Sequence, residues 1–153
     1  MAELRAAVAA VPDPEIPTVT IDDLGILRDV EVVGDRVVVT ITPTYSGCPA
    51  MDAIRTDIRR ALPGRDVEVR TVLAPAWTTD WITESGQAKL RQARIAPPSG
   101  AARAGTVTLS ISVRCPSCGS PDTRELSRFG STACKSLWSC RACGDPFDHF
   151  KAI

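Results

Sequence analysis

Six cysteines with very uneven spacing constrain this chain more than any other feature. Five of them lie within 29 residues near the end of the 153-residue sequence, and Cys48 is the only cysteine in the first 114 residues. Four of the five form two copies of Cys-x-x-Cys-Gly, namely Cys115, Cys118, Cys140 and Cys143. Each motif folds into a tight turn that directs two sulfurs at one point. Two such turns predict a tetrahedral four-sulfur metal site.

Zinc is the metal that we expect in this site. A segment of about 40 residues has too small a core to fold alone, and a structural zinc ion contributes on the order of 10 kcal/mol to the free energy of folding. The same geometry accepts iron, as in rubredoxin, and the residues do not choose between the two metals. We expect the fifth cysteine, Cys134, to be a small buried residue, with a spare ligand or redox thiol as the alternative. His149, next to Phe150, is expected to pack or to lie on the surface.

The residue pattern divides the chain into two modules. Pro, Gly and Ala replace any periodicity in residues 96–105, which we interpret as a linker between a domain of residues 1–95 and a zinc ribbon of residues 106–153. The pattern predicts helices at residues 2–10, 49–62 and 80–94, a hairpin turning at Gly34-Asp35, and strands at residues 67–71 and 107–113. The order αββαβα predicts an α+β fold, with helices on one face of a small sheet.

Charge and hydropathy exclude some classes of protein. Lys+Arg and Asp+Glu both number 18, so the net charge is zero and a nucleic-acid-binding ribbon is disfavoured. The longest apolar run has six residues, too few to span a membrane. The first residues lack the layout of a signal peptide, so we expect a cytoplasmic location.

Cys48 lies in a loop, Thr44-Tyr45-Ser46-Gly47-Cys48-Pro49, between a predicted strand and the predicted helix at residues 49–62. A helix N-terminus presents unpaired N–H groups, which favour a thiolate that ligates soft metal or attacks an electrophile. The alternative is a cysteine that only packs under the loop. A cysteine-dependent enzyme needs a base nearby, and the sole histidine lies in the other module. We therefore do not expect an enzyme.

Two further segments are unusual. Pro14 and Pro17 hold the carboxylates of Asp13 and Glu15 in an extended loop, where these groups could bind metal, accept a proton or cap an element. Trp77 and Trp81 have the spacing of one helix face, and we expect them in the core rather than on a binding surface.

The order of these motifs is similar to that of a known family. Asp13-Pro14-Glu15, Thr44-x-x-Gly47-Cys48-Pro49 and Pro75-x-Trp77 resemble the iron-sulfur cluster assembly domain family, which includes SufT-like proteins. The Cys-x-x-Cys ribbon, with Phe129-Gly130-Ser131-Thr132-Ala133-Cys134-Lys135 inside it, narrows the resemblance to the PaaD type. These are accessory subunits of phenylacetyl-CoA epoxidase, an oxygenase of phenylacetate catabolism.

The resemblance implies a non-catalytic maturation factor that helps to install the iron-sulfur cluster of the epoxidase reductase. The family cysteine corresponds to Cys48 and the acidic motif to Asp13 and Glu15, with Thr44 and Gly47 in the cofactor-binding loop. Cys48 would hold iron or a cluster transiently, and a further ligand would come from a homodimer mate, a partner, a carboxylate or a small thiol. The alternatives are a rubredoxin-like electron carrier and a structural docking component of the oxygenase.

Overall fold

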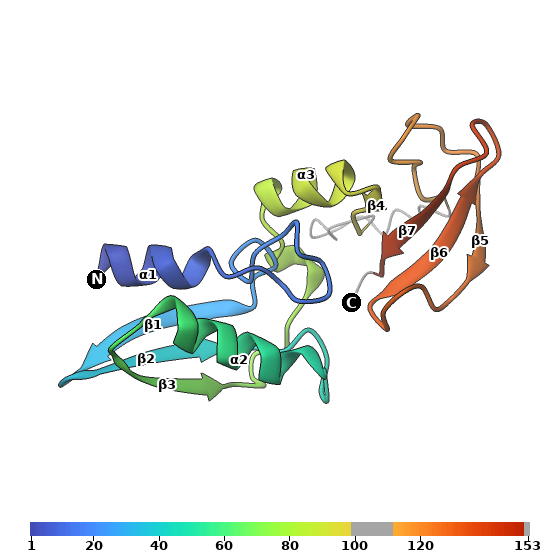
Figure 1. The fold of residues 1–153 in the computed structure, drawn as a ribbon. Coiled ribbons are helices and arrows are strands. Elements are labelled where there is room, and N and C mark those ends of the chain that lie inside the picture. Colours follow the sequence, from blue (N-terminus) through green and yellow to red (C-terminus); the bar gives the residue numbers. More distant parts are fainter. Residues whose placement is uncertain (99–111, 152–153) are drawn as a thin grey trace, which may run out of the picture. The chain divides into compact units, whose positions relative to one another are not determined.

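The computed structural model describes residues 1–98 and 112–151, which belong to two compact units, Met1–Gly86 and Gln87–Ile153 (Figure 1). The elements of the first unit are α1 (Ala2–Ala9), β1 (Leu27–Val33), β2 (Arg36–Ile41), α2 (Ala50–Ala61), β3 (Asp66–Thr71) and the 3₁₀ helix η1 (Thr79–Trp81). Helix α3 (Glu84–Gln92) begins in the first unit and ends in the second. None of the helices in the described residues is long and apolar enough to cross a membrane.

A three-stranded sheet in the order β1-β2-β3 organises the first unit. β1 and β2 form the predicted antiparallel hairpin, with Gly34 at φ +62° in its two-residue turn. β3 pairs with β2 in parallel, so the chain crosses over between them, and α2 is that crossover. This arrangement brings the C-terminal end of β2 and the N-terminal end of α2 together through one short loop, which contains Cys48.

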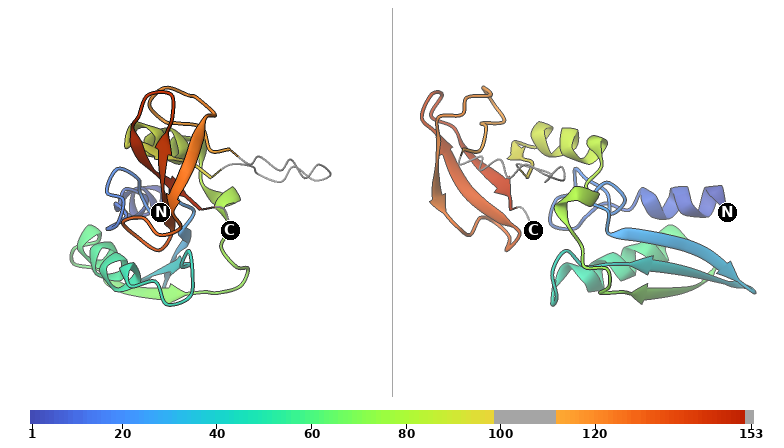
Figure 2. Two further views of the ribbon diagram at one scale, coloured as in Figure 1. Left: turned by 90° about the vertical axis from the view of Figure 1, so that its right-hand side faces the viewer. Right: turned by 180° about the vertical axis from the view of Figure 1, so that it is seen from behind.

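Helices α1 and α2 lie on the same face of this sheet (Figures 1 and 2). The buried residues of α2 are spaced at helical intervals and are Ala50, Met51, Ile54 and Ile58. Pro12 lies shortly beyond α1, where a helix is expected to stop, and Val8 is the buried residue of that helix. The predicted α+β fold with helices on one face of the sheet is confirmed.

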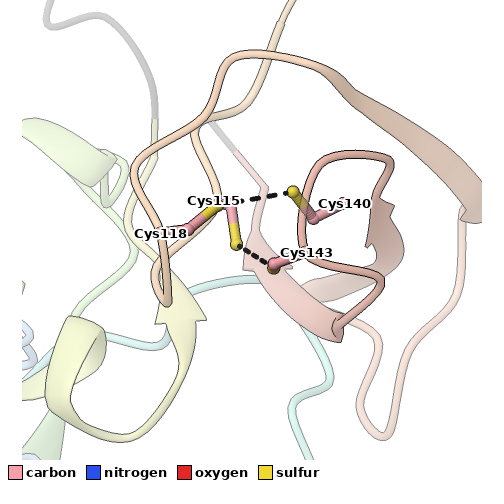
Figure 3. A group of neighbouring side chains, drawn as sticks. All are labelled: Cys115, Cys118, Cys140 and Cys143. Atoms are coloured by element: carbon pink, nitrogen blue, oxygen red, sulfur yellow. Dashed lines mark hydrogen bonds between the residues drawn. The ribbon is translucent and has the colours of Figure 1, made fainter.

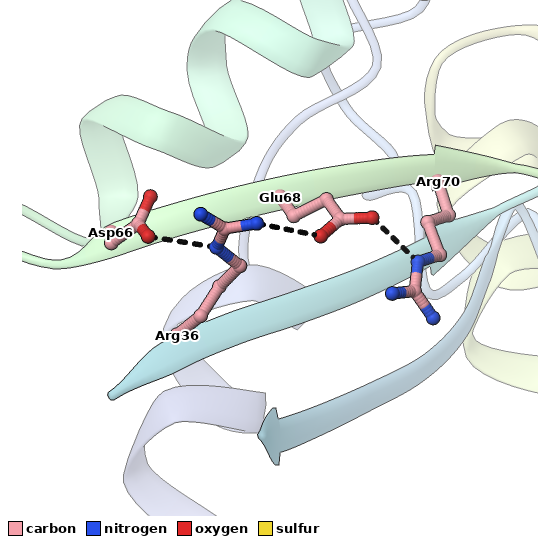
Figure 4. A network of polar contacts seen from close by, with 4 residues as sticks. All are labelled: Arg36, Asp66, Glu68 and Arg70. Atoms are coloured by element: carbon pink, nitrogen blue, oxygen red, sulfur yellow. Dashed lines mark hydrogen bonds and ion pairs between the residues drawn. The ribbon is translucent and has the colours of Figure 1, made fainter. Parts of the chain in front are cut away.

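The opposite face of the sheet carries a chain of ion pairs (Figure 4). Arg36 Nε donates to Asp66 Oδ2 at 2.7 Å, and Arg36 Nη1 donates to Glu68 Oε2 at 3.2 Å. Arg70 Nε donates to Glu68 Oε1 at 2.7 Å. These side chains lie beside Val38, which is 1% exposed although it points away from the helices. Their apolar stems therefore help to cover the centre of an otherwise open face.

Within the first unit, residues 20–25 form a turn that holds the segment after β3 by hydrogen bonds. The Trp77 indole donates to the Leu24 carbonyl at 2.8 Å, and the Thr83 N–H donates to the Asp23 carbonyl at 2.9 Å. The predicted helix at residues 80–94 is shorter than expected, because Thr83 Oγ1 accepts the Gly86 N–H at 2.9 Å and α3 begins only at Glu84. Trp77 lies in the core as predicted, whereas Trp81 is half-exposed beneath the guanidinium of Arg28.

Gly25 is expected to be intolerant of a side chain. Its φ is +68°, and an added Cβ would lie 2.6 Å from Trp81 Cβ and 2.7 Å from the Trp81 carbonyl oxygen. The left-handed backbone costs about 1 kcal/mol for Ala and the forced repacking roughly 2 more, so Gly25→Ala should lower the free energy of unfolding by about 3 kcal/mol. Gly34→Ala is the matched control, since Gly34 has the same backbone conformation with nothing within 4 Å. Equal urea midpoints for the two variants would contradict the proposed steric cost.

A second sheet, in the order β4-β7-β6-β5, forms the cysteine-rich unit. Its strands are β4 (Ile95–Ala96), β5 (Thr123–Ser127), β6 (Lys135–Cys140) and β7 (Pro146–Phe150). The short strand β4 pairs in parallel with β7, so Ile95 and Ala96 belong to the ribbon sheet. Ile95 was expected in the first domain and Ala96 at the start of the linker. Most of the strand expected at residues 107–113 and most of the linker expected at residues 96–105 fall outside the described residues, and the linker stays a prediction.

Candidate functional site

The four cysteines of the two Cys-x-x-Cys motifs converge on one point in the ribbon (Figure 3). Their sulfur atoms all lie within 4.8 Å of one another, with 3.7 Å between the sulfurs of Cys115 and Cys143 and 3.6 Å between those of Cys118 and Cys140. Four Zn–S bonds of about 2.3 Å in a tetrahedron require sulfur separations of about 3.8 Å, whereas a disulfide requires about 2.05 Å. The spacing therefore fits a four-coordinate metal ion and not disulfides.

Each Cys-x-x-Cys turn is closed by the glycine that follows it. Gly119 has φ +74° and donates its N–H to the Cys115 carbonyl, and Gly144 has φ +80° and donates to the Cys140 carbonyl. Backbone N–H groups also approach the sulfurs. Hydrogen bonds from the N–H of Cys143 above all, and from that of Ala142, lower the pKa of the Cys140 thiol to about 7. Donors of this kind stabilise a thiolate ligand, so the second turn is preorganised to present the Cys140 sulfur to a metal.

The four-cysteine cluster is part of the ribbon core. Cys115 and Cys140 are buried, while Cys118 and Cys143 lie at the surface. The two buried ligands pack with Ala96, Val113 and Phe147 in one apolar cluster. Loss of the metal would leave this small core with two buried thiols at its centre, so folding of the ribbon and metal binding are coupled.

Cys134 and His149 lie outside this cluster, as expected from the sequence. Cys134 is buried, and its sulfur lies 3.0 Å from Thr132 Oγ1. His149 is packed edge to face against Trp138, with ring centroids 5.8 Å apart. In residues 1–98 and 112–151 the four ribbon cysteines are the one group of three or more His, Cys, Asp or Glu close enough to share a metal ion.

Burial makes His149 a source of acid sensitivity. Desolvation lowers the pKa of this imidazole to about 4, so between its unfolded pKa near 6.5 and that value the unfolded chain takes up a proton that the folded chain does not. Stability is therefore lost as the pH falls through this window, by about 1 kcal/mol between pH 7 and pH 5 after allowance for solvent screening.

The comparison of wild type with His149→Gln measures this effect, because acid release of metal is common to both. Between pH 7 and pH 5 the wild type should lose more unfolding free energy than His149→Gln does. Parallel pH profiles for the two proteins would show that His149 does not carry the effect.

The Cys48 loop is anchored at its start on the residues that precede β1 and follow β3. The Thr42 N–H donates to the Ile26 carbonyl at 2.9 Å, and Thr42 Oγ1 donates to the Val72 carbonyl. Gly47 then takes φ +85° at an exposed position, a conformation that favours glycine. Cys48 follows, half-buried, and precedes Pro49, which is the N-cap of α2. The helix therefore begins one residue later than predicted, and Cys48 lies just outside it.

The acidic loop reaches the same place from the other side of the domain. The buried Asp13 carboxylate accepts the N–H groups of Glu15 and Ile16 at 2.9 and 2.8 Å, so it caps its own turn. This turn holds Glu15 in a half-buried position. The charges of both carboxylates act on the Cys48 thiol, which places all three predicted residues in one neighbourhood. They do not form a ready three-ligand group within the described part of the chain.

The surroundings of Cys48 oppose the thiolate that we expected from its place at the start of the helix. Desolvation by burial is the largest influence and raises the pKa of the thiol, and the negative charges of Glu15 and Asp13 raise it further. Hydrogen bonds from the Ala50 N–H and the Tyr45 side chain lower the pKa but do not compensate. The helix N-terminus therefore contributes one donor, as predicted, and the surroundings outweigh it.

Tyr45 is a site residue that sequence reasoning gave no role. Its side chain contacts the Cys48 sulfur, and its carbonyl accepts the Cys48 N–H at 3.3 Å. The hydroxyl of an aromatic residue three positions before the cysteine was the available signal. Thr44 is half-buried in the same loop, so the structure keeps it near the site without assigning it a contact to Cys48.

Comparison with known proteins identifies both units. Residues 1–72 match the iron-sulfur cluster assembly protein family, and residues 100–151 match the PaaD zinc beta ribbon domain family. The chain is 46% identical over 154 residues to a protein of Escherichia coli (strain K12) named as a subunit of a 1,2-phenylacetyl-CoA epoxidase, covering 99% of this chain and 92% of that protein. This chain belongs to the PaaD family of phenylacetyl-CoA epoxidase subunits.

Other relatives resemble only the first part of this PaaD-type chain. A Porphyromonas gingivalis (strain ATCC BAA-308 / W83) protein named as an Fe-S protein maturation auxiliary factor is 36% identical over 85 residues, covering 52% of this chain and 80% of that protein. The crystal structure of a domain of unknown function, DUF59, from Bacillus anthracis superposes with a TM-score of 0.54 at 30% identity, covering 58% of this chain and 89% of that one. The PaaD-type chain thus joins a maturation-factor-like domain to a zinc ribbon.

Proposed function

We propose that this chain is a non-catalytic, cytoplasmic maturation factor that helps to install the iron-sulfur cluster of the epoxidase reductase. One observation carries the proposal: a half-buried cysteine lies at the start of α2 within the influence of two carboxylates. The relatives named as Fe-S protein maturation auxiliary factors align with this part of the chain and support the assignment.

The raised pKa of Cys48 suits transient rather than permanent binding. A protonated thiol does not ligate metal, so iron must displace the proton, and metal binding becomes coupled to proton release. The same negative charges of Glu15 and Asp13 that disfavour a bare thiolate attract an iron cation. Proton return to the sulfur would then favour release of the cargo to an acceptor.

A single cysteine cannot hold a cluster alone. Cys48 and the two carboxylates do not form a ready ligand group in the described residues, so further ligands are required from outside the loop. We propose that they come from a partner, a second copy of this chain or a small thiol. The half-exposed position of Cys48 supports such an encounter.

In the ribbon we propose a structural zinc ion held by the four cysteines. The sulfur separations also fit iron, which would make the ribbon a rubredoxin-like electron carrier. Metal analysis of the native protein, purified without air, separates the two assignments. Zinc without a visible charge-transfer spectrum supports the structural role, and stoichiometric iron with a reversible one-electron couple contradicts it.

The maturation role is tested on the acceptor. The epoxidase reductase is produced in cells that contain or lack this chain, and its iron and acid-labile sulfide are measured per polypeptide. We expect a reductase with a markedly lower cluster content in the absence of this chain. Equal cluster content in both preparations would contradict the proposal and favour a structural or docking role.

A further inference from the structure

A pocket on the ribbon, well separated in sequence from the Cys48 loop, combines aromatic and charged side chains. It is open to solvent and has a volume of about 460 Å³. Three rings, two cations and one carboxylate line it, and these belong to Phe129, Trp138, His149, Arg128, Lys151 and Glu125. The four cysteines of the predicted metal site do not line this pocket, so the proposed structural zinc does not explain what the pocket does.

A chain of hydrogen-bond contacts in the pocket wall runs from Trp138 through Ser136 to His149. The Trp138 indole, which can only donate, donates to Ser136 Oγ at 2.9 Å. Ser136 Oγ lies 3.4 Å from His149 Nδ1, so its own hydroxyl proton is available to this nitrogen. When Ser136 donates this proton, Nδ1 is the acceptor and the neutral ring carries its own proton on Nε2. This Nε2–H group is buried and has no hydrogen-bond partner within the part of the chain that the structure describes.

An unpartnered N–H donor in a pocket wall is a costly feature that an acceptor could relieve. A buried donor without a partner destabilises the fold, and an incoming oxygen atom that reached it would relieve that cost. A chain carbonyl or a carboxylate could serve, and the charges on the pocket favour the carboxylate. Glu125 is the one anion among the lining residues, and Arg128 and Lys151 outweigh it.

Phe129 is held at the mouth of the pocket in an exposed position. It is 72% exposed, and the ammonium of Lys151 lies 5.0 Å from its ring centroid. The same ammonium donates to the Arg128 backbone carbonyl at 3.0 Å, so this contact holds the Lys151 cation beside the ring. A large exposed ring beside two cations offers an apolar contact next to an anion site.

The charge of the whole unit points the same way. Residues 87–153 contain 10 basic and 4 acidic side chains, an excess of six positive charges that a zinc ion held by four thiolates reduces to four, whereas residues 1–86 contain 8 and 14, a net charge of −6. The zero overall charge therefore conceals two oppositely charged units. An acidic partner is attracted to the ribbon unit and repelled by the first one.

We propose that this pocket docks an acidic segment of a partner protein, with a carboxylate directed to Arg128, Lys151 and the His149 N–H and an apolar side chain placed on Phe129. The proposal is independent of the Cys48 role, because it depends on the ribbon surface alone. A negative result for the pocket would not contradict the role proposed for Cys48, and a negative result for Cys48 would not contradict docking at the pocket.

Titration of the full-length, metal-loaded protein with a model peptide tests the proposal. The probe is acetyl-Glu-Leu-Glu-Phe-Glu-amide, and its Gln-for-Glu counterpart is the charge control. NMR should show saturable shifts of the Trp138 indole N–H and of the His149 ring, with about tenfold weaker binding of the uncharged peptide, the equivalent of one lost charge contact. Absence of binding at millimolar peptide, or shifts confined to other residues, would overturn the proposal.

Substitutions locate the contact. Arg128→Gln and Phe129→Ser should each weaken binding of the acidic peptide about tenfold, with the metal content unchanged. Arg124→Gln is the matched control, since Arg124 is exposed on β5 next to Glu125 in sequence and therefore points to the opposite face of the strand. Equal weakening by Arg124→Gln would show diffuse charge attraction and not a pocket. If Phe129→Ser loses metal, Arg128→Gln alone decides.

Discussion

Cys118→Ser is expected to release the ribbon metal and to unfold residues 112–151 while the first unit keeps its structure. A serine hydroxyl is a poor replacement for a thiolate ligand, and structural zinc contributes on the order of 10 kcal/mol to the folding of such modules. The apolar cluster around Cys115 and Cys140 is too small to replace that contribution. Metal analysis should show loss of most of the bound metal, and the dispersed amide resonances of the ribbon should collapse.

Cys134→Ala is the control for that experiment. Cys134 is a buried ribbon cysteine outside the metal cluster, so its loss removes a thiol without removing a ligand. We expect full metal content and a modest loss of stability, about 1 kcal/mol for a small truncation in the core. Full metal content in Cys118→Ser, or equal metal loss in both variants, would show that the ligand assignment is wrong.

Local patterns predicted those parts of the fold that depend on neighbours in sequence. Gly34-Asp35 specifies the hairpin turn by itself, and the spacing from Met51 to Ile58 specifies the buried side of α2. The metal site belongs to the same class, because each Cys-x-x-Cys-Gly turn preorganises two ligands within four residues. Only the approach of the two turns to each other depends on the rest of the fold, and metal binding would stabilise that approach.

The predictions failed where distant segments decide the outcome. Ile95 and Ala96 form a strand only because they pair with the edge of β7, which lies more than 50 residues later in the chain. Trp77 and Trp81 have helical spacing, but the Trp77 indole donates to the Leu24 carbonyl, 53 residues away, and Trp81 lies under the Arg28 guanidinium. A periodicity argument cannot anticipate a hydrogen bond across so many residues.

The protonation state of Cys48 shows the same limit at the functional site. The helix N-terminus can be predicted from the sequence, and its N–H group does lower the pKa of the thiol. The degree of burial and the approach of Glu15 and Asp13 arise from tertiary structure, and they reverse the net direction. The motifs therefore indicated that Cys48, Asp13 and Glu15 belong together, whereas they did not indicate the electrostatic balance around the thiol.

Cys48→Ala is expected to abolish support of the reductase cluster while the protein stays folded and metal-loaded. The substitution removes the proposed iron ligand, but Cys48 is half-buried and lies outside both α2 and the ribbon, so little packing is lost. In cells that contain only this variant, the iron and acid-labile sulfide of the purified reductase should fall to the level found in cells that lack the chain.

Two controls make that result specific to the Cys48 sulfur. Cys134→Ala removes a thiol elsewhere and Ser46→Ala alters an exposed residue of the same loop, and neither should lower the cluster content of the reductase. Glu15→Gln should give a partial loss, because it removes one of the charges that attract iron but no sulfur. Normal cluster content with Cys48→Ala would exclude the thiol as a carrier, and the PaaD-type chain would then act through its docking surfaces alone.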